Sequence, residues 1–380
     1  MGEPIRILNL FTIMNRGGAE TMVMNYYRNV DRSKIQFDFL VHRQERGAYD
    51  DEIEAMGGRI YRMCPIYPQN FSRYKKMLKV FFDEHPEYNI LHSHMSELGC
   101  YAFIEAHKRG IKVKICHAHN APVKGSMTLK EKAQLIFRDY FKHKMLPYSD
   151  FLFICGEEAG NWLYGKENKH RFVMMNNAVD SQKFRYSPDH RNKIRQELNL
   201  KDDFVILNVG RFNPQKNHTF IIDVFEQIQN LHPDSKLLLA GNGELEEEIK
   251  AKVRSLKLEN KVLFLGLRDD IHKLFSASDA FLFPSLYEGL PVTMVEAQSS
   301  GIKCFISDAI PNQCILGDDV TVISLNESAE NWAKKIAVLA DGYERQDRYD
   351  NMVTAGFDIQ ANAKWLEEFY LTEYSKKYKD

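Results

Sequence analysis

Short apolar segments alternate with stretches of helical period along the first half of the chain. The apolar segments predict strands at residues 5–11, 37–41, 89–94, 113–117 and 150–155. The stretches between them predict helices, among them residues 19–29, 71–84, 97–109 and 128–145. Strands that alternate with helices are typical of βαβ units, so we expect a parallel sheet covered by helices.

The pattern stops in a polar stretch at residues 177–190 and then begins again. A helix is predicted at residues 218–230, and strands at 204–209, 236–240, 262–265, 280–283 and 303–306. The sequence therefore predicts two consecutive α/β domains, with ligands outside the carboxyl ends of the strands, in the cleft between the domains. The last helix, in residues 358–380, either caps the second domain or crosses back to the first.

Composition narrows the range of functions. The 380 residues include 51 Lys and Arg against 52 Asp and Glu, so the chain has no basic field and is not expected to bind nucleic acid. Its apolar runs are far shorter than the ~20 residues that span a bilayer, and no secretory signal is recognisable, so we expect a cytoplasmic protein. The six cysteines lack C-x-x-C spacing, which favours reduced, buried thiols.

The strongest candidate site follows the strand at 280–283. In residues 285–297, Gly289 lets backbone approach a ligand, and Pro291 suits the first turn of a helix whose free amides would bind a phosphate. Glu288 precedes this helix and Glu296 lies well inside it. The two carboxylates are therefore too far apart to share a metal ion, and we expect them to accept hydrogen bonds from separate sets of hydroxyl groups.

Two further loops carry features of anion sites. Arg211 and Lys216 lie between a strand and a helix, where both cations would project over the carboxyl edge of the sheet. One such cation about 4 Å from a phosphate charge contributes roughly 4 kcal/mol before desolvation, so two could stabilise a departing diphosphate without a metal. In the first domain, Gly17 and Gly18 precede a helix, and this pair predicts either a phosphate contact or an ordinary tight turn.

Histidines cluster at the ends of two predicted strands. His92 and His94 end one strand, and His117 and His119 end the next. His-x-His pairs share a strand face and could meet a zinc ion, but no carboxylate or cysteine lies at an obvious ligand spacing, so we predict no metal site. We expect His119 to hydrogen-bond a polar ligand and the others to be structural.

Two basic, aromatic-rich segments have two interpretations. Residues 71–82 and 130–144 resemble helices that lie on a membrane surface, and they equally resemble ordinary amphipathic core helices.

In order along the chain, the motifs are N-R-G-G-A-E at 15–20, H-A-H at 117–119, G-R at 210–211 with Lys216, A-G-N-G-E from 240, and the two glutamates at 288 and 296. With these motifs the chain resembles, over nearly its whole length, the retaining glycosyltransferases of family 4, which have the GT-B fold. More narrowly, it is similar to bacterial exopolysaccharide and capsular polysaccharide transferases.

The resemblance implies two Rossmann-like domains facing each other across a cleft. Residues 1–180 would form the acceptor side, and residues 190–357 would bind a nucleotide-sugar. The implied diphosphate contacts are the amides of Gly17 and Gly18, those near Gly289, Leu290 and Pro291, and the side chains of Arg211 and Lys216. Glu288 would hold the donor sugar, Glu296 the ribose, and His119 would lie beside the transferred sugar. No metal or cofactor is implied, since the nucleotide-sugar is a substrate.

We therefore expect a cytoplasmic enzyme that moves a sugar from a UDP-sugar to a glycan or lipid-linked acceptor in surface polysaccharide synthesis. Contact with the inner face of the membrane stays open. One alternative is a nucleotide-sugar epimerase on the same scaffold, which needs an acid/base pair across the sugar, and Glu288 has no evident partner in the sequence. The other is a carbohydrate-binding subunit without activity.

Overall fold

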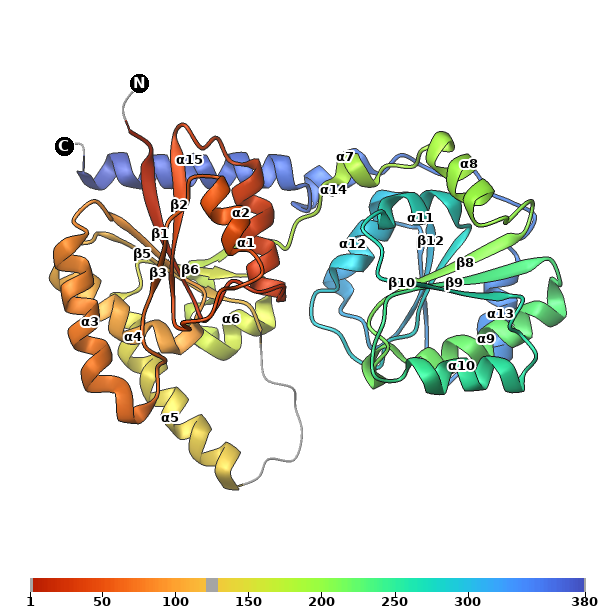
Figure 1. The fold of residues 1–380 in the computed structure, drawn as a ribbon, viewed down its shortest axis with the longest axis horizontal. Coiled ribbons are helices and arrows are strands. Elements are labelled where there is room, and N and C mark those ends of the chain that lie inside the picture. The colour runs from red at the N-terminus through yellow and green to blue at the C-terminus, as the bar shows by residue number, and fades with distance from the viewer. Residues whose placement is uncertain (1–2, 121–128, 379–380) are drawn as a thin grey trace. The chain divides into compact units, whose positions relative to one another are not determined.

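The protein folds as two compact units, shown by a computed structural model that describes residues 3–120 and 129–378 (Figure 1). Unit 2 comprises Ala178–Asp358. Unit 1 comprises the chain up to Asn177 and the chain from Ile359 onward, so the last helix belongs to unit 1. Both units contain a parallel sheet with helices on its two faces, which confirms the predicted α/β fold class.

In the described residues of unit 1, the sheet has seven parallel strands in the order β3-β2-β1-β4-β5-β6-β7. Their bounds are Ile5–Phe11 (β1), Ile35–Val41 (β2), Ile60–Arg62 (β3), Ile90–Ser93 (β4), Val113–Ala118 (β5), Phe151–Ile154 (β6) and Phe172–Met174 (β7). The sequence pattern missed the two edge strands, β3 and β7. Each has only three residues, and neither is fully buried, so no apolar run marks them.

Helices cover both faces of this sheet. Their bounds are Gly18–Asn29 (α1), Asp50–Ala55 (α2), Phe71–Glu84 (α3), Cys100–Lys108 (α4), Leu129–Met145 (α5), Glu157–Tyr164 (α6) and Ile359–Tyr378 (α15). Buried side chains from α3, α4, α5 and α6 share one core with Leu8 and Leu10 of β1. On the other face, α15 places Tyr370 against Phe37 and Phe369 against Phe153. The predicted start of α5, Thr128, lies outside the described residues.

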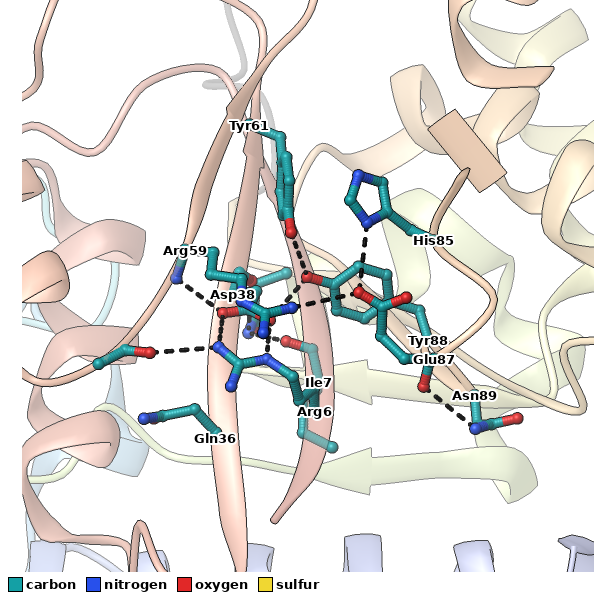
Figure 2. Close-up of polar contacts among 12 residues, drawn as sticks. Arg6, Ile7, Gln36, Asp38, Arg59, Tyr61, His85, Glu87, Tyr88 and Asn89 are labelled. Carbon is teal, nitrogen blue, oxygen red and sulfur yellow. Dashed lines mark hydrogen bonds and ion pairs between the residues drawn. The ribbon is translucent and has the colours of Figure 1, made fainter. Parts of the chain in front are cut away.

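A buried ion pair joins the strands in the amino-terminal half of the unit 1 sheet. Figure 2 shows Arg6 of β1 facing Asp38 of β2. The fully buried Asp38 carboxylate accepts two hydrogen bonds of 2.5 Å from the Arg6 guanidinium, and one of 2.7 Å from the Tyr88 hydroxyl. The Arg59 amide donates a further bond of 2.7 Å. Because every charge here is paired and hydrogen-bonded, this cluster has a structural role.

Unit 2 contains six parallel strands in the order β10-β9-β8-β11-β12-β13. Their bounds are Phe204–Val209 (β8), Ser235–Ala240 (β9), Val262–Gly266 (β10), Ala280–Phe283 (β11), Lys303–Ser307 (β12) and Val320–Ile323 (β13). The helices are Ser181–Phe184 (α7), Pro188–Glu197 (α8), His218–Leu231 (α9), Glu246–Ser255 (α10), Ile271–Ala277 (α11), Val292–Ser299 (α12), Ala329–Ala337 (α13) and Tyr349–Thr354 (α14). One core lies under α9, α10 and α13, and another under α8, α11 and α12.

The polar stretch predicted between the domains is largely structured. It contains α7 and the start of α8, and Phe184 at the end of α7 packs in the unit 2 core. Ser187 caps α8, since its hydroxyl accepts the His190 amide at 3.3 Å. The interrupted hydrophobic pattern therefore marks a change from one unit to the next, rather than an unstructured linker.

The two basic segments differ in how much apolar surface they expose. In α3, Tyr74, Leu78, Phe81 and Phe82 are buried in the unit 1 core, as expected of an amphipathic core helix. In α5, Phe141 and Met145 are buried, whereas Ile136, Phe137 and Tyr140 are exposed at the surface. Within the described residues, no helix combines the length and the apolar content that crossing a bilayer requires.

Candidate functional site

The candidate residues of unit 2 follow its two central strands. The order of strands along the chain reverses between β8 and β11, and the loops after these two strands carry Arg211, Lys216 and Glu288. Parallel sheets bind ligands at such a reversal, outside the carboxyl ends of the strands. The fold therefore brings the two strongest sequence motifs of unit 2 to one place.

Lys216 and Glu288 form an ion pair at this edge. The Lys216 ammonium lies 2.6 Å from Glu288 Oε1, and the two side chains are 15% and 7% exposed. Gln215 donates a second hydrogen bond of 3.1 Å to Glu288 Oε2, and the ammonium also lies 4.4 Å from the centre of the Phe283 ring. The carboxylate is thus held in one orientation by two donors from the β8 loop. Gln215 was not predicted as a site residue, although it directly precedes Lys216.

Arg211 has a more exposed environment than Lys216. Its guanidinium lies 3.1 Å from the Glu244 carboxylate, and the two side chains are 71% and 52% exposed. Glu244 follows Gly241, whose φ of +142° favours glycine, and a Cβ there would lie 2.0 Å from the Gly210 carbonyl oxygen. The G-N-G-E motif therefore brings a carboxylate beside Arg211 by close approach of two backbone segments.

A short 3-10 turn at Pro214–Lys216 presents Lys216. Asn217 precedes α9 but has a left-handed conformation, with φ of 56°, and its amide side chain donates to the Pro284 carbonyl at 3.2 Å. Asn213 instead accepts the Lys216 amide at 3.2 Å, capping a short 3-10 turn. Asn217 therefore ties the β8 loop to the β11 loop instead of capping the helix.

The start of α12 offers unpaired amides. Pro291 precedes the helix and has no N–H, so the donors near it are those of Leu290, Val292 and Thr293, which make no hydrogen bond to any part of the chain that the structure describes. A Cβ on Gly289 would meet no atom within 4 Å, so the space beside it is open. These groups together could bind an anion.

Glu296 lies inside α12 and is largely desolvated. Among the side chains and backbone groups that the structure describes, none donates a hydrogen bond to its carboxylate and none forms an ion pair with it. Burial raises the pKa of Glu296 to about 7, against a smaller opposing effect of Lys183. A desolvated acceptor without a partner is suited to hydroxyl groups of a bound ligand.

In unit 1, the glycine turn contains a carboxylate. Helix α1 begins at Gly18 after Gly17, and a Cβ on Gly17 would lie 2.3 Å from Glu20 Oε2. Burial raises the pKa of Glu20. The Glu20 carboxylate therefore lies over the helix start, whereas a Cβ on Gly18 would meet nothing within 4 Å. No role was predicted for Glu20 from the sequence.

The histidines at the ends of β4 and β5, which are His92, His94, His117 and His119, form one hydrogen-bonded chain that also includes a cysteine. His92 Nε2 lies 3.2 Å from His117 Nδ1, and His94 Nδ1 lies 2.9 Å from His119 Nε2. Cys155, directly after β6, joins the pairs: its sulfur lies 3.2 Å from His117 Nε2 and 3.3 Å from His119 Nδ1. Both ring nitrogens of His119 therefore have partners within the chain itself.

The prediction of no metal site relied on the lack of a suitably spaced cysteine, and the structure contradicts that reason. No cysteine lies near these histidines in the sequence, but neighbouring strands place Cys155 between His117 and His119. Burial lowers the pKa of His119 to about 4 and that of His117 well below its usual value, and it raises the pKa of Cys155 to about 12. The rings and the thiol are thus neutral at pH 7.

The epimerase alternative requires an acid/base pair, and the sequence showed no evident partner for Glu288. Glu288 does have a titratable partner, Lys216, at 2.6 Å. The two groups contact each other directly, so they do not form a pair that flanks a sugar ring from opposite sides.

Comparisons with known proteins identify the family. The family model described as glycosyl transferases group 1 matches residues 190–354. The capsular polysaccharide biosynthesis glycosyltransferase CapH of Staphylococcus aureus is 25% identical over 97% of this chain and 99% of its own. The UDP-Gal:alpha-D-GlcNAc-diphosphoundecaprenol alpha-1,3-galactosyltransferase of Escherichia coli is 28% identical over 88% of this chain and 89% of its own.

A solved structure and a further relative complete the comparison. The structure of Anabaena Alr3699/HepE in complex with UDP is similar, with a TM-score of 0.72 and 18% identity over 96% of this chain and 95% of that chain. This likeness confirms the predicted GT-B type of fold. The putative glycosyltransferase EpsF of Bacillus subtilis (strain 168) is 35% identical over 96% of both chains. The protein therefore belongs to the glycosyl transferases group 1 family and is a glycosyltransferase.

Proposed function

We propose that this protein transfers a hexose from a UDP-sugar to a lipid-linked glycan acceptor in surface polysaccharide synthesis. The transfer would take place in the cytoplasm, would retain the anomeric configuration, and would need neither a metal ion nor a cofactor. The observation that carries the proposal is the Lys216–Glu288 pair, 2.6 Å apart, at the strand-order reversal of unit 2 and beside the unpaired amides of α12.

These groups suit the two parts of a nucleotide-sugar that must be recognised. Lys216 has three N–H donors, so it can keep Glu288 and still contact a phosphate oxygen. Glu288, with its orientation fixed by Gln215 and Lys216, would accept hydrogen bonds from sugar hydroxyls. Electrostatic stabilisation of the departing diphosphate by Lys216, Arg211 and the start of α12 would lower the barrier.

Glu296 would bind the ribose. Its carboxylate is desolvated and has no partner in the described part of the chain, so two ribose hydroxyls would supply the hydrogen bonds it lacks. The roles implied for Gly17, Gly18 and His119 stay predictions. For His119 to contact the sugar, one of its ring nitrogens would have to exchange a partner, since both already have one.

Donor and acceptor are inferred from relatives. The name of the Escherichia coli relative gives a UDP-galactose donor and a sugar linked to diphosphoundecaprenol, and HepE was crystallised with UDP. CapH is named for capsular polysaccharide biosynthesis. These names support a UDP-sugar and a lipid-linked acceptor for the present protein.

A turnover assay tests the proposal. The purified enzyme is incubated with labelled UDP-glucose, UDP-galactose or UDP-N-acetylglucosamine and diphosphoundecaprenol-linked sugars, with EDTA present, and the product anomer is determined by NMR. We expect transfer with retention. Isomerised donor in the absence of acceptor would instead favour an epimerase, and sugar binding without turnover of any donor would favour a carbohydrate-binding subunit.

A lipid-linked acceptor also requires access to a membrane, and we infer that α5 provides it. Ile136, Phe137 and Tyr140 expose apolar surface on this basic helix. Ile136→Gln should weaken binding to anionic vesicles about tenfold, since a buried apolar side chain contributes roughly 1.5–3 kcal/mol. Val80→Gln, at an exposed position of α3, is the matched control, and equal binding of both variants would exclude this surface.

A further inference from the structure

The cluster at the carboxyl ends of β5 and β6 has the donor atoms of a metal site. His117 Nε2, His119 Nδ1 and Cys155 Sγ all lie within 4.8 Å of one another. The sulfur is 3.2 and 3.3 Å from the two nitrogens. In a tetrahedral zinc site, metal–nitrogen and metal–sulfur bonds of about 2.0 and 2.3 Å place neighbouring ligand atoms roughly 3.5 Å apart. Only small side-chain shifts would therefore admit an ion.

A fourth soft donor lies beside the sulfur. Met22 of α1 is buried, and its thioether is 3.5 Å from Cys155 Sγ. Imidazole, thiolate and thioether ligands select copper(I) or zinc(II) over magnesium or calcium, which prefer oxygen. We propose that His117, His119 and Cys155, with Met22 beside them, form a binding site for a soft or borderline transition-metal ion, zinc(II) or copper(I).

The hydrogen bonds behind His119 orient it for this role. The Asn9 amide group donates to the carbonyls of Ile7 and Asp38, so its Oδ1 faces His94 Nε2, at 3.3 Å, as an acceptor. His94 must then carry its proton on Nε2 and accept at Nδ1 from His119 Nε2–H. The lone pair of His119 Nδ1 is thereby directed at Cys155, in the way that a hydrogen bond to the other ring nitrogen orients a metal-binding histidine.

The hydrogen bonds behind His117 allow it to release its Nε2 lone pair. His117 Nδ1 faces His92 Nε2, and His92 Nδ1 lies 2.6 Å from the Tyr370 hydroxyl, which can donate or accept. When His117 and His92 both carry their protons on Nδ1, His117 Nδ1–H donates to His92 Nε2. His92 Nδ1–H then donates to the Tyr370 oxygen. The one proton lost on metal binding is that of the Cys155 thiol, which passes to solvent.

The site combines burial with a route of entry. His117, Cys155 and Met22 are buried, whereas His119 is half-buried and gives an ion access from the surface. The proposal does not depend on the proposed transfer reaction, since it rests on side chains whose arrangement is seen without any substrate.

Cobalt(II) binding tests the site directly. The full-length, metal-free protein is titrated with cobalt(II), and the near-ultraviolet thiolate-to-cobalt band is recorded. Zinc(II), or copper(I) supplied with a competing chelator, is then used to displace the cobalt. We expect one ion per chain and a thiolate band, and the stronger displacing ion identifies the preferred metal.

A matched pair of cysteine variants identifies the ligand. Cys155→Ser should abolish the thiolate band. Cys116→Ser is the control, because the Cys116 sulfur lies 3.6 Å from the Met145 thioether in the same unit. This variant should retain the band. No band in the wild type, a band that survives in Cys155→Ser, or a band lost equally in Cys116→Ser would overturn the proposal.

Two further variants keep the test decisive if Cys155→Ser does not fold. Removal of a group that hydrogen-bonds to a metal ligand typically weakens metal binding about 10- to 100-fold. We therefore expect roughly tenfold weaker binding for Tyr370→Phe and about 100-fold or more for the ligand variant His119→Ala. Folding of each variant is checked by thermal unfolding. Wild-type cobalt affinity in a folded His119→Ala protein would overturn the site.

Discussion

The two sheets of this protein have similar topology but opposite chemistry at their carboxyl ends. In unit 2, the loops after the central strands carry charged side chains, and Lys216 and Glu288 are paired there. In unit 1, the corresponding edge carries histidines and a thiol that desolvation keeps neutral. The difference shows that the fold supplies a position for ligands, whereas the side chains decide whether that position suits an anion or a neutral or metallic ligand.

The largest expected effect comes from removing the buried cation of unit 2. Lys216→Ala should lower kcat roughly 100-fold or more, because it removes a preorganised donor to the departing diphosphate and leaves Glu288 without its ion-pair partner. Steady-state transfer rates measure the effect. Lys250→Ala is the matched control, since it breaks a partly exposed pair with Glu246 on α10. Similar rates in both variants would remove Lys216 from the reaction.

Glu296 should make UDP binding depend on pH. Because its pKa is about 7, about a tenth of the Glu296 carboxyl groups are ionised at about pH 6 and most are ionised at about pH 8. If the ionised form accepts the ribose hydroxyls, affinity for UDP should rise roughly tenfold over this range. Calorimetric titration of wild type and Glu296→Gln measures this. The variant should lose this dependence and keep only that of the UDP phosphates. Identical pH profiles would show that the ribose does not contact Glu296.

The same raised pKa has a defined effect on the unliganded fold. Between the usual value of 4.5 and about 7, the folded state binds more protons at Glu296 than the unfolded state does. Its contribution to stability is therefore fully present below about pH 4.5 and is lost as the pH rises through about 7.

In the neutral cluster of unit 1, a single hydroxyl should have a moderate effect on stability. Tyr370→Phe leaves the buried His92 Nδ1 without its partner at 2.6 Å, and should lower the free energy of unfolding by about 1–2 kcal/mol. Urea unfolding measures this loss. Tyr374→Phe, on the same helix, is the control, because its hydroxyl makes no hydrogen bond to a described residue. Equal losses would mean that the hydrogen-bonded chain contributes nothing.

The smallest effect is expected at the exposed edge of the charged site. Glu244→Gln breaks the pair with Arg211, but both side chains are more than half exposed, at 52% and 71%. The free energy of unfolding should stay unchanged within the error of the measurement, because solvent screens this pair. A measurable loss in thermal or urea unfolding would show that this pair, like Lys216–Glu288, is coupled to the structure of the loops.

Much of the fold could be predicted from the hydrophobic pattern. The bounds of β1, β8 and β11 agree with prediction to the residue, because each is a mainly apolar segment whose side chains are mostly buried on both faces of the sheet. The edge strands β3, β7 and β13 were missed, since they are short and partly exposed. The edge strand β10 was predicted, because residues 262–265 form a continuous apolar run. Where such a run is lacking, only tertiary pairing identifies an edge strand.

The candidate site shows the same limit. Lys216 and Glu288 could be brought together from sequence, because each follows a strand and parallel strands end at one edge of a sheet. Cys155 could not be assigned to His117 and His119, since their contact depends on strand register and side-chain direction. The contacts of Gln215 with Glu288 and of Glu244 with Arg211 were missed for the same reason, because a loop sequence does not show which charged group a side chain will contact.

The order of the units along the chain has a consequence for biosynthesis. A ribosome delivers α15 only after every residue of unit 2 has been made. Until then, the face of the first sheet that contains Phe37 and Phe153 lacks the helix that packs on it. The inserted domain can therefore mature before the domain that surrounds it. During this time the nascent protein exposes an aggregation-prone apolar surface, to which chaperones bind.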